Sequence, residues 1–207
     1  DQAAILADAV ATPFSAVKRT GRVSIGNAVA VWGLGGVGTH IVQLAKLAGA
    51  IPVIGIDIND AVLERAKELG ADYTFRSDDP DLMEKITEAT GGRKIDVAFD
   101  AVGLQSTFKQ AIASLDFNGR AVLVGLSGQE IDAGPILSFG LQRKQAFGHL
   151  GYKPVDIYLL AELLKDGRLD LSQSISGVVP LSEIERGIEM METKEGNPIR
   201  ILVDPWE

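Results

Sequence analysis

The sequence predicts an α/β fold in which a doubly wound parallel sheet is covered by helices on both faces. Short runs of apolar, β-forming residues recur along the chain, and amphipathic helical patterns lie between them. The runs are nearly continuous in apolar character, as is typical of parallel strands buried on both faces. These patterns alternate from about residue 27 to residue 150, as expected of consecutive strand–helix–strand units.

The apolar runs define five expected strands, at residues 28–32, 51–56, 95–99, 121–126 and 146–150. Apolar residues at helical spacing define helices between them, at residues 37–48, 62–69 and 108–115. Another helix is expected between the pair Asp79-Pro80, which is typical of a helix start, and the pair Gly91-Gly92, which ends it.

The two ends of the chain differ from this alternating centre. Residues 1–20 are expected to be helical, with a break at Pro13. After residue 151 we expect a helix at 157–164, a second helix and a strand at 199–203. The chain therefore divides into a helical lead-in at 1–24, a sheet domain at 25–151 and a C-terminal segment at 152–207.

The second C-terminal helix is expected to begin at Ser182. Glu185 follows three residues later, which predicts a capping box. The spacing of Ile184, Ile188 and Met191 predicts an apolar face directed inward.

Composition excludes several classes of function. The net charge of −8 is spread along the chain and the basic residues do not form a long run, so we expect no nucleic-acid surface. Apolar runs stop well short of the roughly 18 residues of a membrane span, and no targeting segment is visible, so we expect no membrane partner and a cytoplasmic location. With no cysteine and two histidines, this chain alone is not expected to build a zinc site. The absence of an initiator Met suggests a piece of a longer protein.

A glycine-rich turn joins the first expected strand to its helix. Gly33, Gly35 and Gly38 form the pattern G-x-G-x-x-G. In a Rossmann-type fold the first glycine allows the tight turn, the second lets the backbone approach a pyrophosphate, and the third lets the helix pack against the strand. The helix N-terminus adds partial positive charge there. We therefore predict that this turn, with Gly36 and Val37, binds a dinucleotide.

Asp57 ends the next expected strand, 19 residues after Gly38. A carboxylate at about this spacing accepts hydrogen bonds from the adenosine ribose, whereas a 2′-phosphate would place negative charge against it. No Arg or Lys occupies positions 58–62, so NAD is favoured over NADP. The alternative is a surface acid that caps the helix starting near Asn59.

Several segments together resemble one known family. They are ADAVATPFSAVK at residues 7–18, GLGGVG, VIGIDIND, AKELGAD, FDAVG and GRAVLVGL, and the C-terminal GVVPLSEIERGIEMMETKEGNPIRILV. Over nearly its full length the chain is similar to the coenzyme-binding part of the zinc-dependent medium-chain alcohol dehydrogenases. The family's N-terminal catalytic domain has no counterpart in the sequence.

The resemblance implies further coenzyme-binding residues. Thr12 would lie beside the nicotinamide, and Arg200 would reach the pyrophosphate. His149 and Leu150 would offer backbone groups to the carboxamide; the alternatives are a packed histidine ring and, for Arg200, a solvated edge-strand residue. The strand ends that would line the cleft are Ala101, Val102, Val124, Gly125 and Leu126.

The resemblance also implies the chemistry of the whole enzyme. Zinc would polarise an alcohol, and the resulting zinc-bound alkoxide would pass hydride to NAD, with a small alcohol or carbonyl compound as substrate. Asp8 stands where the family has its last zinc ligand in this part of the chain, so it is a candidate metal ligand. Pairing through residues 146–150 would make a homodimer. Without the catalytic domain, the isolated chain is expected to be inactive.

Two other functions stay open at this point. One is a stand-alone NAD(H)-binding module without catalysis. The other is part of a zinc-free, NADPH-dependent quinone or enoyl reductase of the same superfamily, for which a small or basic residue would be expected in place of Asp57.

Overall fold

A computed structural model describes residues 1–194 and 196–206, and the side chain of Ser138 is outside this description. Its central feature is a six-stranded sheet with every pair of neighbours parallel and the order β3-β2-β1-β4-β5-β6. This is the strand order of a Rossmann fold, and it confirms the predicted fold class. The strands are β1 (Val29–Trp32), β2 (Val53–Asp57), β3 (Tyr73–Arg76), β4 (Ile95–Asp100), β5 (Leu115–Leu123) and β6 (Gln145–Gly148).

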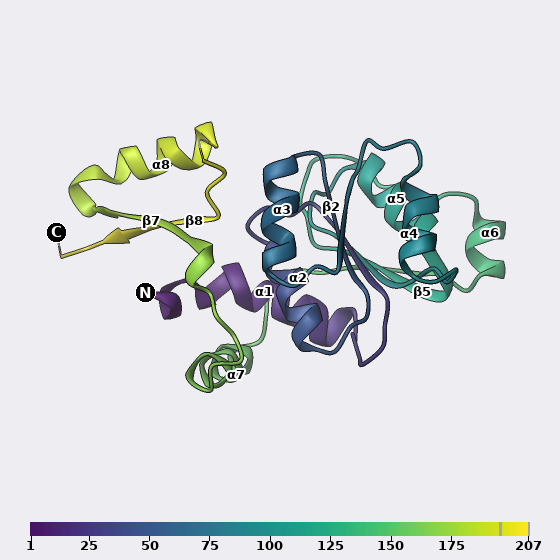
Figure 1. Ribbon diagram of the computed structural model, residues 1–207, viewed down its shortest axis with the longest axis horizontal. Coiled ribbons are helices and arrows are strands. Elements are labelled where there is room, and N and C mark those ends of the chain that lie inside the picture. The colour runs from purple at the N-terminus through teal and green to yellow at the C-terminus, as the bar shows by residue number, and fades with distance from the viewer. Residues whose placement is uncertain (195, 207) are drawn as a thin grey trace.

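Helices cover both faces of this sheet, because successive side chains of a strand point to opposite sides. In β1, Val29 and Val31 belong to the hydrophobic cluster that includes α2 (Gly38–Leu47) and α3 (Asp60–Glu68). Ala30 and Trp32 belong to the cluster with α4 (Leu82–Ala89) and α5 (Gln105–Ser114). Figure 1 shows α3 and the pair α4–α5 on opposite sides of the strands.

The lead-in packs onto the first of these clusters. It consists of the helical turns η1 (Gln2–Ile5), η2 (Leu6–Val10) and η3 (Ala16–Thr20) and the helix α1 (Ala11–Ser15). The predicted break at Pro13 is wrong. Pro13 lies in the first turn of α1, where backbone N–H groups have no partner within the helix, so proline fits there. The irregular backbone lies at Ala7 and Asp8 instead.

The lead-in is also bound to α7 (Pro154–Lys165), the helix predicted at 157–164. Arg19 donates hydrogen bonds to both carboxylate oxygens of Asp156, which is fully buried. This contact joins two segments that are 137 residues apart.

A small second sheet lies at the other end of the chain. β7 (Ile175–Pro180) follows the turn η4 (Ser172–Ser174) and pairs in parallel with β8 (Arg200–Asp204), and α8 (Ile184–Thr193) contacts both strands. In Figure 1 this unit is at the opposite end of the molecule from α6 (Ile136–Leu141).

The predictions for α8 are wrong in two respects. The turn η5 (Leu181–Glu183) precedes the helix, so Ser182 is not the N-cap and no capping box forms. Ile184 and Ile188 are 41% and 52% exposed rather than directed inward, whereas Met191 is half-buried and lines a cavity beside the large sheet. α8 packs on the strands through Gly187, where an added Cβ would lie 3.0 Å from Val179.

Other boundaries shift by a few residues. The strand predicted at 121–126 begins at Leu115 and ends at Leu123, and α4 begins at Leu82 rather than at the Asp79-Pro80 pair. Within the described ranges, no helix is both long and apolar enough to cross a membrane.

Candidate functional site

The carboxyl ends of β1, β2, β4 and β5 meet at one edge of the large sheet. β1 pairs with β2 on one side and with β4 on the other, so the order of strands reverses at β1. In open α/β sheets this reversal leaves a crevice beyond the strand ends, where ligands bind. The predicted glycine-rich turn follows β1 at this position.

The three glycines of the turn meet three different steric demands. Gly33 has φ of +81°, a conformation that favours glycine. A Cβ on Gly38 would lie 1.7 Å from the carbonyl oxygen of Gly33, so only glycine lets α2 begin this close to β1. A Cβ on Gly35 would have no protein atom within 4 Å, so Gly35 faces open space.

The turn presents unpaired backbone donors to that space. Among the described residues, the N–H groups of Gly35, Gly36 and Val37 have no hydrogen-bond partner, and α2 has no side-chain cap at its N-terminus. Such N–H groups at the positive end of a helix dipole suit an anion.

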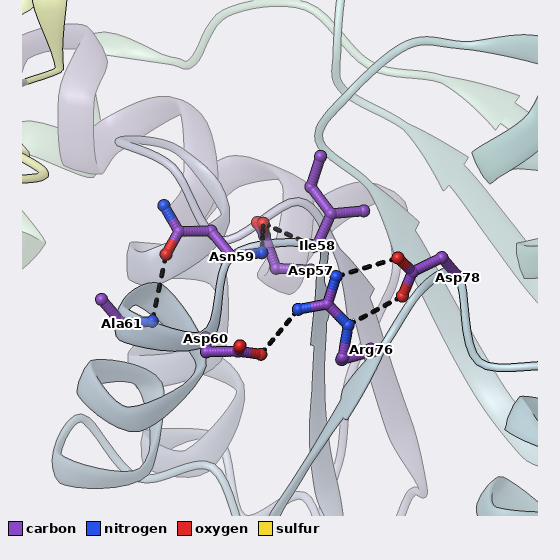
Figure 2. Close-up of polar contacts among 7 residues, drawn as sticks. All are labelled: Asp57, Ile58, Asn59, Asp60, Ala61, Arg76 and Asp78. Atoms are coloured by element: carbon purple, nitrogen blue, oxygen red, sulfur yellow. Dashed lines mark hydrogen bonds and ion pairs between the residues drawn. The ribbon is translucent and has the colours of Figure 1, made fainter.

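Asp57 points toward this turn. Its Oδ2 accepts a 2.7 Å hydrogen bond from Leu34 N, and its Oδ1 accepts bonds from Ile58 N and Asn59 N at 2.7 and 3.0 Å. Figure 2 shows the latter two, together with the bond from Ala61 N to Asn59 Oδ1 that caps α3. The alternative of Asp57 as the helix cap is therefore wrong, because Asn59 caps α3.

A cation on the neighbouring strand is already paired. Arg76, the last residue of β3, is in register with Asp57. It donates to Asp60 at 2.7 Å and to both oxygens of Asp78 at 2.9 and 2.8 Å (Figure 2). These two carboxylates raise the pKa of Arg76 and oppose its positive charge.

Arg200 reaches the glycine turn from β8. A Cβ on Gly36 would lie 1.8 Å from Arg200 Nη1, which donates to the Ile199 carbonyl at 2.7 Å. Burial lowers the pKa of Arg200, and Asp8 acts in the opposite direction. The guanidinium therefore lies partly buried against the turn, and the alternative of a solvated edge-strand residue does not apply.

A cavity of about 340 Å³ separates the turn from the C-terminal segment. Arg65, on α3, donates a 2.6 Å hydrogen bond to the Asn197 carbonyl, and Asn59 Nδ2 donates to Asn197 Oδ1 at 2.8 Å. Burial lowers the pKa of Arg65, whereas Asp57 acts to raise it. Sequence reasoning missed this contact. The polar and glycine residues that line the cavity include Gly35, Gly36, Asp57, Arg65, Lys194 and Arg200.

Thr12 and His149 lie together on the other side of the crevice. His149 Nε2 is 3.1 Å from the Thr12 carbonyl and Nδ1 is 2.8 Å from Thr20 Oγ1. A carbonyl only accepts, so Nε2 carries the proton, and burial lowers the pKa of His149, which favours the neutral ring. The ring is therefore packed against the lead-in, as the alternative held. The backbone N–H of His149 is donated to the Leu123 carbonyl at 2.9 Å.

The ends of β4 and β5 form the floor beside Gly33. A Cβ on Gly33 would lie 2.4 Å from Val102 and 3.4 Å from Ala101, so these two residues lie against the turn. A Cβ on Gly125 would lie 2.4 Å from Gly103 N and from Val102, so the end of β5, with Val124 and Gly125, follows next to them. Leu126 and Leu150 are largely exposed.

Asp100, at the end of β4, shapes this floor and was missed in the sequence. Its Oδ1 accepts hydrogen bonds from Val102 N and Gly103 N at 2.8 and 3.0 Å, and its Oδ2 accepts one from Thr107 Oγ1 at 3.0 Å. Burial raises its pKa. The only available signal was an acid at the end of a buried strand.

Asp8, the candidate metal ligand, is exposed and accepts a 2.9 Å hydrogen bond from Thr12 Oγ1. Within the part of the chain that the structure describes, no three His, Asp or Glu residues come together to hold a metal ion. Zinc sites use three or four protein ligands. The described residues alone therefore do not fit a zinc site.

Comparison with known proteins identifies the family. A family model described as zinc-binding dehydrogenase matches residues 36–166. The chain belongs to this family. It is 30% identical to geraniol dehydrogenase of Carpoglyphus lactis, over 98% of the chain and 54% of that protein. It is also 30% identical to (R,R)-butanediol dehydrogenase of Bacillus subtilis, over 90% of the chain and 53% of that protein.

A solved structure gives the same result. The alcohol dehydrogenase from Thermus sp. ATN1 superposes with a TM-score of 0.90 at 26% identity, covering 98% of this chain and 58% of that one. The chain thus spans about half the length of the relatives it matches, and it corresponds to the NAD-binding part of zinc-dependent alcohol dehydrogenases. The predicted family resemblance is confirmed.

Proposed function

We propose that this chain binds NAD(H) and positions its nicotinamide for hydride transfer in a dehydrogenase that acts on an alcohol or polyol, or on the corresponding carbonyl compound. The main support for the proposal is that a turn with unpaired backbone N–H groups lies beside the carboxylate of Asp57, which backbone hydrogen bonds hold in place. The N–H groups of Gly35, Gly36 and Val37 have no partner among the described residues, Gly35 borders open space, and the carboxylate of Asp57 is bonded to Leu34 N beside them.

The pyrophosphate is assigned to the glycine turn. The free N–H groups donate to its oxygens, and Arg200 adds a cation whose planar donors suit phosphate. The pyrophosphate approaches the backbone most closely at Gly35, because a side chain at this position would occupy the space assigned to the ligand.

The adenosine ribose is assigned to Asp57. Backbone N–H groups hold the carboxylate in place, and Oδ2, which accepts only the bond from Leu34 N, retains a lone pair for a ribose hydroxyl. A 2′-phosphate would meet this carboxylate, while the nearest strand-end cation, Arg76, is paired with Asp60 and Asp78. The site is therefore selective for NAD(H) over NADP(H), which disfavours the NADPH-dependent reductase.

The nicotinamide is assigned to the space near Thr12 and the ends of β4 and β5. Bound NAD accepts a hydride from the alcohol carbon, and NADH returns it to the carbonyl carbon. In this chain Ala101, Val102, Val124, Gly125 and Leu126 exclude water from one side of the ring. The His149 carbonyl and Leu150 N–H, which have no partner among the described residues, orient the carboxamide.

A zinc site would need further ligands, beyond the described residues, in addition to the candidate Asp8. We therefore derive no step through zinc.

We propose the division into a lead-in, a coenzyme domain and a C-terminal segment at 1–24, 25–151 and 152–207. The last segment would pack on a catalytic domain, and β6 would pair two copies.

Isothermal titration of the protein with NADH and NADPH tests the proposal. We expect NADH to bind at least tenfold more tightly than NADPH, and ADP-ribose to compete with NADH. Equal or tighter binding of NADPH would favour the reductase, and absence of binding by either coenzyme would refute the proposal. NADH binding without any turnover of alcohols by the full-length protein would favour the stand-alone module.

A further inference from the structure

We infer that Thr39 and His40 are positioning residues that direct the N–H groups of Gly35 and Val37 toward the coenzyme phosphates. The inference rests on the proposed function, because it explains how the turn keeps its donors on the ligand side. Both residues directly follow the last glycine of the motif, and both side chains are buried.

Thr39 holds the peptide between Leu34 and Gly35. Its Oγ1 donates a 2.7 Å hydrogen bond to the Leu34 carbonyl, and its side chain is 1% exposed. Among the described residues the only cis peptide is Ile51-Pro52, so this peptide is trans. In a trans peptide the C=O and the following N–H point in opposite directions. A carbonyl drawn back toward α2 therefore sends the Gly35 N–H into open space.

His40 does the same for the next-but-one peptide. Its Nδ1 lies 2.7 Å from the Gly36 carbonyl, and its Nε2 lies 2.9 Å from Ser174 Oγ. The carbonyl only accepts, so Nδ1 carries the proton and Ser174 donates to Nε2. Because the Gly36 carbonyl is fixed, the Val37 N–H points to the opposite side.

The ring remains neutral in this position. Burial lowers the pKa of His40 to about 4, and the nearby Arg200 acts in the same direction. The tautomer with a proton on Nδ1 is therefore the one present at neutral pH, and the bond to Gly36 does not depend on a charge.

The glycines make these two contacts necessary. Gly35 and Gly36 leave the turn without side chains, so rotation of a peptide meets little steric resistance. A rotated peptide would present a carbonyl oxygen, rather than an N–H, to the phosphates. The hydroxyl of Thr39 and the ring of His40 bind the two carbonyls whose rotation would do this. Buried polar groups cost free energy unless they are hydrogen-bonded, and here carbonyls of the turn are the partners of Thr39 Oγ1 and His40 Nδ1.

Substitutions of similar shape separate this role from packing. Thr39→Val removes the hydroxyl at nearly constant volume, and Thr39→Ser keeps it. His40→Leu removes the ring nitrogens, and His40→Asn keeps a donor at the position of Nδ1. Thr90→Val is the matched control, because Thr90 is also buried and bonded through Oγ1 to a helical carbonyl, that of Ile86, outside the turn.

The readouts are NADH affinity by fluorescence titration, thermal stability, and NADH-induced shifts of the Gly35 and Val37 amide resonances. We expect Thr39→Val and His40→Leu to weaken NADH binding about tenfold each, the effect of one hydrogen bond. The NADH-induced shift of the Gly35 amide resonance should be smaller in Thr39→Val, and that of the Val37 amide resonance should be smaller in His40→Leu. Thr39→Ser and His40→Asn should recover most of the affinity, and Thr90→Val should bind like the wild type.

Wild-type affinity and amide shifts in a folded Thr39→Val protein would overturn the inference while leaving the proposed function intact. The same holds if Thr90→Val weakens NADH binding as much as Thr39→Val does. If Thr39→Val does not fold, the comparison of His40→Leu with His40→Asn decides. Failure of the wild type to bind NADH would instead refute the proposed function.

Discussion

The N–H of Leu34 and the carboxylate of Asp57 join the ends of β1 and β2 through a 2.7 Å hydrogen bond. The same carboxylate accepts two further backbone bonds at the start of α3. It is therefore fixed in direction before any ligand arrives, and a fixed acceptor discriminates between ligands better than a mobile one.

The first prediction concerns this acid. Asp57→Asn keeps one oxygen for the bonds from Ile58 N and Asn59 N, but it removes the negative charge and places an NH2 donor where the second oxygen accepts from Leu34 N. We expect NADH to bind about tenfold more weakly and the preference over NADPH to fall toward equality, because the ribose loses a charged acceptor and a 2′-phosphate loses its repulsion. Calorimetric titration of both coenzymes measures this ratio. An unchanged preference would remove Asp57 from the ribose site.

The second prediction concerns Arg76. In an Asp57→Ser background, the added change Asp78→Asn removes one of the two carboxylates that pair with Arg76. The guanidinium then becomes available to a 2′-phosphate near Asp57, and we expect NADPH affinity to rise about fivefold over Asp57→Ser alone. Raising the salt concentration should reduce this gain.

The matched control is Asp166→Asn, which removes a surface acid paired with Arg168, away from the crevice. It should leave the affinity for NADPH unchanged. An equal gain from this control would show that net charge, and not Arg76, is responsible.

The third prediction separates two glycines of one motif. Gly35→Ala places a methyl group in open space, so we expect normal thermal stability but NADH binding weakened at least tenfold. Gly38→Ala forces a methyl group into the Gly33 carbonyl, so we expect stability to fall by several kcal/mol. Urea denaturation and NADH titration of both variants measure the difference. A Gly35→Ala protein that binds NADH normally would place the pyrophosphate elsewhere.

The central sheet and the glycine turn with Asp57 could be predicted from the sequence, because both depend on short-range patterns. Five of the six strands of the large sheet were predicted from short apolar runs, and the glycines and Asp57 are recognised by spacing alone. β3 was missed because its residues, Tyr73–Arg76, form a half-exposed edge strand with no clear periodicity. β7 was missed because Ser176 and Gly177 interrupt its apolar run and Pro180 ends it.

The missed parts of the site depend on contacts between distant segments. His40 and Ser174 are 134 residues apart, and Arg65 and Asn197 are 132 apart. No local pattern marks such pairs. The wrong prediction for α8 has a similar cause. Periodicity predicted that Ile184 and Ile188 face inward, but it does not indicate which surface a helix packs against.

The last prediction concerns stability against pH. The pKa of His40 is about 4 in the folded protein, against an ordinary value of about 6.5. Between these values the unfolded chain binds a proton that the folded chain does not, so stability falls as pH falls from 6.5 to 4. His40 contributes about 3 kcal/mol to this loss. The lowered pKa of His149 adds a loss of the same sign as pH falls below about 6.5.

Urea denaturation of the wild type and of His40→Asn at pH 7, 5.5 and 4.5 tests this assignment. The variant loses some stability at pH 7, because a smaller side chain leaves a cavity. Its stability should nevertheless fall much less between pH 7 and 4.5, since the share of His40 is gone. The loss from His149 and the opposite effect of the raised pKa of Asp100 are the same in both proteins. The carboxylates with lowered pKa, such as Asp78 and Asp170, lose their contribution below about pH 4, outside this range. Equal losses in the two proteins would show that His40 is accessible to protons in the folded state, and that its burial does not hold it neutral.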